Sequence, residues 1–127
     1  MLFELLDGHS TINHWTIEME QLLCHLLGDY LLQTSWMALN KSKRWWPAIV
    51  HVSIYTSVFL LLTTSIPALL VIGGTHLLID HYQFPKIWFN IVRGKEDSPE
   101  WFLMWLYVIQ DNSWHLIINY LALRYLT

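Results

Sequence analysis

The sequence has little charge and almost no cysteine. Only 13% of its 127 residues are charged, and Cys24 is the single cysteine. One cysteine cannot form a disulfide within the chain, so a disulfide-rich scaffold is excluded. The 7 Lys and Arg against 10 Asp and Glu give a net charge of -3. Because phosphate backbones are bound by basic faces, we expect no nucleic-acid partner.

Hydrophobic residues are what the sequence has in excess. They make up 54% of the chain, with 8 Trp and 6 Tyr among them. This content is higher than in an ordinary soluble domain, and Trp and Tyr collect where a membrane meets water. A Trp-rich soluble core is the alternative. The composition favours an integral membrane protein that forms a single domain over residues 1–127.

Four apolar stretches have the length and punctuation of helices, and a short amphipathic segment precedes them at residues 1–14. The expected fold class is therefore all-α, an integral membrane four-helix bundle with the lipid bilayer as its first partner. The segment from Gln83 to Glu100 is expected to be a loop. The expected spans are residues 16–39, 47–64, 67–82 and 100–126.

The connections between these spans differ in charge. The first and third connections carry the basic residues, which are Lys41, Lys43, Arg44, Lys86, Arg93 and Lys95. The connection between the second and third spans has none. Because basic loops stay on the cytoplasmic side of a membrane, we expect a multi-pass protein with both its N- and C-termini outside.

Three aspartates interrupt the apolar stretches, and each has a histidine four residues away. The pairs are His25 with Asp29, His76 with Asp80, and Asp111 with His115. On a helix, residues i and i+4 lie on one face, so each pair points its imidazole and carboxylate the same way. His51 stands alone in the remaining apolar stretch. Each of the four segments therefore offers at least one potential metal ligand.

An ionised aspartate inside a membrane is costly, and three of them need compensating positive charge. Two divalent cations would supply it, and imidazole with carboxylate suits Zn²⁺, Mn²⁺ or Fe. Hydrogen bonds between His and Asp that hold the helices together, or a relay for protons or ions, are the alternatives left open. The predicted metal ligands are His25, Asp29, His51, His76, Asp80, Asp111 and His115.

Two amides extend the polar stripes by one more turn. Gln33 follows Asp29 by four residues, and Asn119 follows His115 by four. Each is expected either to orient a substrate beside the metal or to form a hydrogen bond between helices. Gln33 and His51 are the predicted catalytic residues.

The segments His25–Thr34, His51–Thr56, Thr75–Asp80 and Asp111–Leu116 resemble the successive motifs of a small family of bacterial and phage multi-pass membrane proteins. That family is known only as a domain of unknown function. The likeness covers about residues 20–120 and implies a location in the bacterial inner membrane. More distantly, the placement of His and Asp on apolar helices is similar to membrane-bound metal-dependent hydrolases, which implies hydrolysis.

Together, the residues and the resemblance predict an intramembrane metal-dependent hydrolase. Its substrate would be a phosphate-containing lipid or another membrane-associated phosphoester, drawn in by basic residues near the site. A non-enzymatic phage or bacterial membrane protein for interaction or exclusion, and an ion or proton carrier, are the alternatives. Assembly into oligomers is left open. The basic residues expected to attract the substrate are Lys41, Lys43, Arg44 and Lys86.

Overall fold

A computed structural model of the protein describes residues 14–93 and 98–127, and every regular element in these residues is helical. Residues 1–13 of the expected amphipathic segment lie outside this range. The elements are α2 (His14–Leu26), a π-helical turn η1 (Leu27–Leu31), α3 (Ser35–Asn40), α4 (Trp45–Val58), a 3₁₀ turn η2 (Phe59–Leu61), α5 (Ile66–Tyr82), α6 (Phe84–Arg93) and α7 (Glu100–Tyr125).

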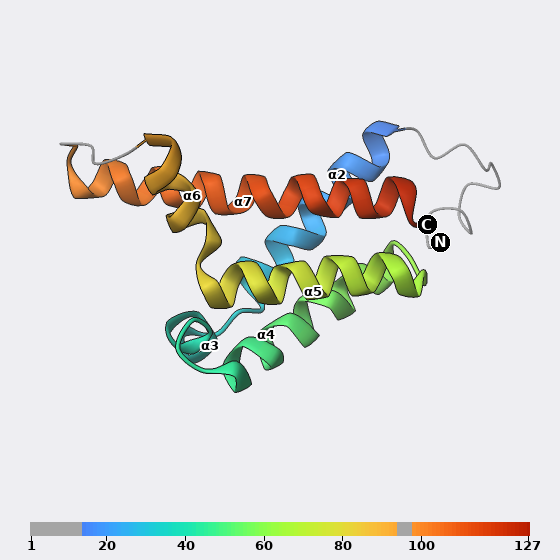
Figure 1. The fold of residues 1–127 in the computed structure, drawn as a ribbon. Helices are drawn as coiled ribbons and strands as arrows, with labels where there is room; N and C mark the ends of the chain where they lie inside the picture. The colour runs from blue at the N-terminus through green and yellow to red at the C-terminus, as the bar shows by residue number, and fades with distance from the viewer. Residues whose placement is uncertain (1–13, 94–97) are drawn as a thin grey trace.

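Helix α5 lies at the centre of the arrangement. It packs against α4 on one side and against the long α7 on the other, and α2 packs against α7. Figure 1 shows α5 and α7 running side by side, with α2 crossing α7 at a steep angle. Helix α6 leads from the end of α5 back to the first half of α7 and contacts both. Helix α5 therefore lies between α4 and α7 and contacts both.

Local signals set the ends of α3 and α5. The hydroxyl of Ser65 accepts a hydrogen bond from Ala68 N at 3.4 Å at the start of α5, and Thr34 Oγ1 accepts one from Met37 N at 3.3 Å at the start of α3. Such caps pair backbone N–H groups that have no partner within the helix. Gln83 ends α5 in the left-handed conformation, with φ of 53°, and turns the chain into α6.

The first expected span, residues 16–39, is not one continuous helix. In the turn η1, Leu32 N donates to Leu27 O, five residues back, at 2.9 Å. The chain then leaves the helical conformation until Thr34 caps α3. π-Helical turns are frequently found at functional sites, and this one carries Asp29. The expected loop between Gln83 and Glu100, in turn, contains α6.

The predictions of a membrane protein, of transmembrane helices and of an integral membrane bundle are wrong. Among the described helices, none is both long and apolar enough to cross a bilayer. Helices α4 and α5 have 14 and 17 residues, whereas a span needs about 20. Helix α7 has 26 residues, but Gln110, Asp111, Asn112 and His115 interrupt its apolar sequence.

The predicted multi-pass location in the bacterial inner membrane, with both termini outside, is wrong for the same reason, because it required membrane-spanning helices. The composition misled because it counts apolar residues without showing how far they run along one uninterrupted helix. The expected partners, which are a lipid bilayer, a lipid phosphate and further copies of the chain, are not tested by a single chain.

The interior of the bundle is part apolar and part polar. The apolar cluster consists of Cys24, Tyr55, Val58, Phe59, Ile72, Ala122 and Leu123. Beside it lie buried polar side chains, among which are His25, Asp29, His51, His76, Asp80, His115 and Asn119. Buried polar groups are costly unless they are paired, and buried charges are more costly still. We therefore expect each of these buried polar side chains to have a hydrogen-bond or ionic partner.

Gly28 gives the first testable prediction. A Cβ atom added there would lie 2.6 Å from Tyr55 Cδ2, and the Tyr55 ring is fully buried and cannot retreat into solvent. We expect Gly28→Ala to lower the free energy of unfolding by about 1–3 kcal/mol, because overpacking forces neighbours out of position. Chemical denaturation measures this change.

Gly74→Ala is the matched control, because nothing lies within 4 Å of a Cβ added at Gly74. There the better helix propensity of alanine should leave stability unchanged or raise it by about 1 kcal/mol. Equal effects of the two substitutions would show that Gly28 is not needed for the approach of Tyr55.

Candidate metal centre

Three elements bring four buried ligand groups together. His51 comes from α4, His76 and Asp80 come from α5, and Asp29 comes from η1. A second group, which shares Asp29, adds two residues of α7, Asp111 and His115. In each group, one nitrogen or oxygen atom per residue lies within 4.8 Å of all the others. These His and Asp groups could hold a metal ion.

The first group has the spacing of a tetrahedral site. His51 Nε2 lies 2.9 Å from His76 Nε2, 3.1 Å from Asp29 Oδ1 and 3.3 Å from Asp80 Oδ2. His76 Nε2 lies 3.2 Å and 3.1 Å from the same two oxygens. With metal–ligand bonds of 2.0–2.1 Å, neighbouring ligands of a tetrahedral ion are about 3.3 Å apart. The four atoms are thus close to the positions that one ion requires.

Hydrogen bonding alone does not account for this cluster. A neutral imidazole carries a single N–H, yet each of the two Nε2 atoms faces the other nitrogen and two carboxylates. The Nδ1 atoms of His51 and His76 are buried and have no hydrogen-bond partner among the residues that the structure describes. Both rings therefore make their polar contacts with the described residues through Nε2. A cation between the four atoms would satisfy all of them, so the donor set fits a metal.

The two central carboxylates each face two ways. Asp80 turns Oδ2 toward His51 and His76, and its Oδ1 lies 3.2 Å from His115 Nε2. Asp29 turns Oδ1 toward the same two rings, and its Oδ2 faces the opposite side, 3.6 Å from His25 Nε2. Of the two, only Asp29 belongs to both ligand groups.

The ionisation of these groups follows from their neighbours. Burial alone would raise the pKa of Asp29 and Asp80. Hydrogen bonds from histidines and the charge of His76 outweigh burial and hold both pKa values below their usual range. Burial would lower the pKa of His115, but hydrogen bonds to two carboxylates raise it to about 9. The central carboxylates are therefore held as anions, the form that binds metal.

Lys41 supplies a positive charge at the edge of the cluster. Its Nζ donates to Asp80 Oδ2 at 2.7 Å and to Gln33 Oε1 at 2.8 Å. Burial would lower the pKa of Lys41, and the charge and hydrogen bond of Asp80 raise it above its ordinary value. The backbone of Lys41 is held by His81, whose Nδ1 donates to Lys41 O at 2.8 Å while its ring stacks on Trp45. The lysine is thereby fixed beside the carboxylate.

The protonation state of His25 follows from Asn112. Asn112 Nδ2 donates to Val108 O at 2.9 Å and to Tyr30 OH at 2.7 Å. Because a backbone carbonyl only accepts, the amide oxygen of Asn112 must face the other way, 2.7 Å from His25 Nε2. His25 Nε2 therefore carries a proton and donates to Asn112. Burial lowers the pKa of His25, which keeps the ring neutral.

Tyr55 completes this chain of hydrogen bonds. Its hydroxyl accepts from Asn119 Nδ2 at 2.7 Å and donates to His25 Nδ1 at 2.8 Å. The Tyr55 ring also stacks on His76, with ring centroids 3.7 Å apart. One buried tyrosine thus pairs the unprotonated nitrogen of His25 and orients a ring in the first ligand group.

The structure brings most of the predicted ligands together, but not all of them. His25 lies beside the cluster with its Nε2 bonded to Asn112, and Gln33 holds Lys41 and donates to Asp29 O. The predicted ligands within the two groups are Asp29, His51, His76, Asp80, Asp111 and His115.

Sequence reasoning missed the parts played by Tyr55 and Asn112, and it missed the contact of Lys41 with Asp80. Tyr55 follows His51 by four residues and Asn112 adjoins Asp111, so both had a weak signal in their spacing. Lys41 was predicted to attract an anionic substrate, but its contact with Asp80 had no local signal, because the two residues are 39 positions apart in the chain.

The sequence profile of one family, described as "Protein of unknown function (DUF3307)", matches residues 17–126. The predicted likeness to a family of unknown function is thereby confirmed. Its bacterial or phage origin and the distant likeness to hydrolases stay predictions. No curated protein and no solved structure matches the chain.

The second testable prediction concerns Tyr55. Tyr55→Phe removes the hydroxyl and leaves Asn119 and His25 Nδ1 without their buried partner. We expect the free energy of unfolding to fall by about 1–3 kcal/mol, because an unpaired buried polar group keeps its desolvation cost. Denaturant titration measures the loss, and ¹⁵N NMR of the His25 ring should show that Nδ1 has lost its hydrogen bond while Nε2 keeps the proton that it donates to Asn112.

Tyr30→Phe is the control for the same change of one hydroxyl. Tyr30 is 52% exposed, so water can replace its hydroxyl as the partner of Asn112. Its effect should stay below about 0.5 kcal/mol, as for other surface substitutions. A loss at Tyr30 equal to that at Tyr55 would contradict the role given to the buried chain of hydrogen bonds.

Proposed function

Since the chain belongs to the DUF3307 family of proteins of unknown function, we propose its function from the site itself, as a metal-dependent hydrolase of phosphoesters. The observation that carries the proposal is the spacing of the first ligand group. Five pairs of atoms from His51, His76, Asp29 and Asp80 lie between 2.9 and 3.3 Å apart. That spacing suits one small divalent ion.

Two ions fit the donors better than one. The first would be held by His51, His76, Asp29 and Asp80, and the second by His115 and Asp111 together with Asp29, which belongs to both groups. Imidazole with carboxylate suits Zn²⁺, Mn²⁺ or Fe. Paired divalent ions would also neutralise the three carboxylates.

A bound metal pair would generate hydroxide near neutral pH and stabilise the charge on a phosphoryl group. The residues of the chain have supporting roles. His51 acts as a ligand, because its Nε2 points into the ligand group and its Nδ1 faces no partner. Gln33 is a positioning residue, because it reaches the site through Lys41 Nζ. This assignment replaces the catalytic roles that the sequence predicts for both.

The main alternative is that the His and Asp residues only hold the helices together. Paired hydrogen bonds of that kind match donors with acceptors one to one. Here each of the two Nε2 atoms has three neighbours at hydrogen-bonding distance and at most one proton to share. A proton carrier would use the same groups, and metal content separates it from a hydrolase.

The third testable prediction is metal content. Protein purified without a His tag should carry close to two equivalents of transition metal by elemental analysis, as two ligand groups predict. His76→Ala and Asp80→Ala should each reduce that content. His81→Ala is the control, because His81 bonds Lys41 O and stacks on Trp45 outside the ligand groups. Folded protein without metal would remove the proposal.

The fourth testable prediction separates an enzyme from a scaffold. Asp→Asn at Asp29, Asp80 or Asp111 keeps size and hydrogen bonding but removes the charge that binds metal. Turnover of a phosphoester panel that includes lipid phosphates should fall by about a hundredfold or more, because the metal supplies the nucleophile.

The same Asn variants should remain folded, as judged by circular dichroism. If the aspartates serve only as hydrogen-bond acceptors between helices, Asn should replace them with little loss. Full activity in all three variants would therefore contradict the hydrolase proposal.

A further inference from the structure

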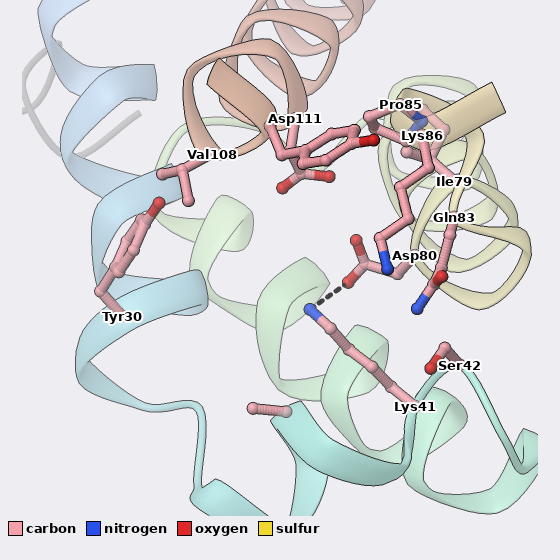
Figure 2. Close-up of a pocket in the computed structure, with 12 residues that line it drawn as sticks. Tyr30, Lys41, Ser42, Ile79, Asp80, Gln83, Pro85, Lys86, Val108 and Asp111 are labelled. Carbon is pink, nitrogen blue, oxygen red and sulfur yellow. Dashed lines mark hydrogen bonds and ion pairs between the residues drawn. The ribbon is translucent and has the colours of Figure 1, made fainter. Parts of the chain in front are cut away.

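A cavity opens directly onto the ligand groups. Its volume is about 250 Å³, and its walls include the carboxylates of Asp80 and Asp111 together with Lys41 and Lys86. Figure 2 shows the two carboxylates on one side of this space, with the two lysine side chains reaching toward Asp80 from opposite directions. A molecule in the cavity would touch the candidate metal centre and both ammonium groups.

The ammonium of Lys86 is free to bind a ligand. It has no ion pair or hydrogen bond with any residue that the structure describes, although it lines the cavity beside two carboxylates. Lys41 uses two of its three N–H donors on Asp80 and Gln33 and has one left. Lysine ammonium groups are common ligands of phosphate. The cavity therefore has two cations with unused donors.

The balance of charge points to a dianion. Two divalent ions outweigh the carboxylates of Asp29, Asp80 and Asp111 by one positive charge, and Lys41 and Lys86 add two more. A hydroxide nucleophile removes one of these three charges. The two that remain match a phosphomonoester, which carries close to two negative charges near neutral pH. A phosphodiester or a carboxylate ester would leave positive charge unpaired.

The size of the cavity favours the same class of substrate. At about 250 Å³ it is smaller than the roughly 300–1,000 Å³ of pockets that enclose drug-sized ligands. Such a volume holds a phosphoryl group and part of a small alcohol. It has less room for two large substituents on one phosphorus atom.

We propose that this cavity is a phosphomonoester pocket in which Lys86 and Lys41 recognise the dianionic phosphoryl group. The proposal rests on the hydrolase function given above. In the reaction, hydroxide from water forms a new P–O bond and the P–O bond to the alcohol breaks. The proton left from water goes to the departing alkoxide. The products are an alcohol and inorganic phosphate, and no further reactant is needed.

The test, which is the fifth prediction, uses metal-loaded full-length protein with phenyl phosphate and diphenyl phosphate as substrates and inorganic phosphate as a binding probe. Lys86→Met should raise KM for phenyl phosphate and the Kd for inorganic phosphate about tenfold, because one charged hydrogen bond is lost. Its kcat should change less, and its metal content should stay the same. Isothermal titration calorimetry measures phosphate binding without turnover.

Lys43→Met is the matched control. The sequence predicted that Lys43 attracts the substrate, but this lysine is exposed and does not line the cavity, so the substitution makes the same charge change away from the pocket. It should alter KM and Kd less than twofold. A short-chain phosphatidate in detergent micelles serves as a lipid monoester. Hydrolysis of either monoester at least tenfold faster than diphenyl phosphate supports the pocket and shows whether the phosphate comes from a lipid or a free ester.

Two results would overturn the pocket while leaving the hydrolase in place. One is faster hydrolysis of diphenyl phosphate than of both monoesters by protein that retains its metal. The other is an equal effect of Lys86→Met and Lys43→Met on phosphate binding. Folded protein that holds no metal would instead overturn the hydrolase, and this inference with it.

Discussion

Two aspartates that are held as anions close to one another inside a helical bundle impose the main constraint on this structure. Asp29 and Asp80 are buried, and their pKa values are held below the usual range although burial alone would raise them. Like charges this close repel unless positive groups lie between them. His115 and Lys41, whose pKa values are raised, lie against Asp80, and the packing of α5 against α7 brings His115 there.

A second layer of side chains holds the ligands in place. Tyr55 stacks on His76 and links Asn119 to His25, and Asn112 fixes the other side of the His25 ring. Groups of this kind, which orient ligands from outside, are as much a part of metal sites as the ligands themselves. The close approach of Tyr55 also depends on Gly28 having no side chain. The contacts of Tyr55 therefore determine both how closely the helices pack at Gly28 and how the rings of His25 and His76 are oriented.

The cavity beside the cluster adds positive charge on the side that a substrate can reach. Lys41 and Lys86 come from different parts of the chain, one from the connection before α4 and the other from α6. Both reach toward Asp80 (Figure 2). A centre with buried anions inside and ammonium groups at its opening would suit a metal ion first and an anionic substrate second, as the proposed function requires.

The sequence by itself determined the helical content and the pairing of His with Asp at four residues' distance, because both depend on the period of a single helix. The bounds of α5 and α7 were near those expected for the same reason. Only the tertiary structure decided that the first span breaks at η1, that α6 forms, and that no described helix is a membrane span. It also decided that His25 faces Asn112 and that Lys41 reaches Asp80. These contacts join residues far apart in the chain, so they follow from how helices pack and leave no local pattern.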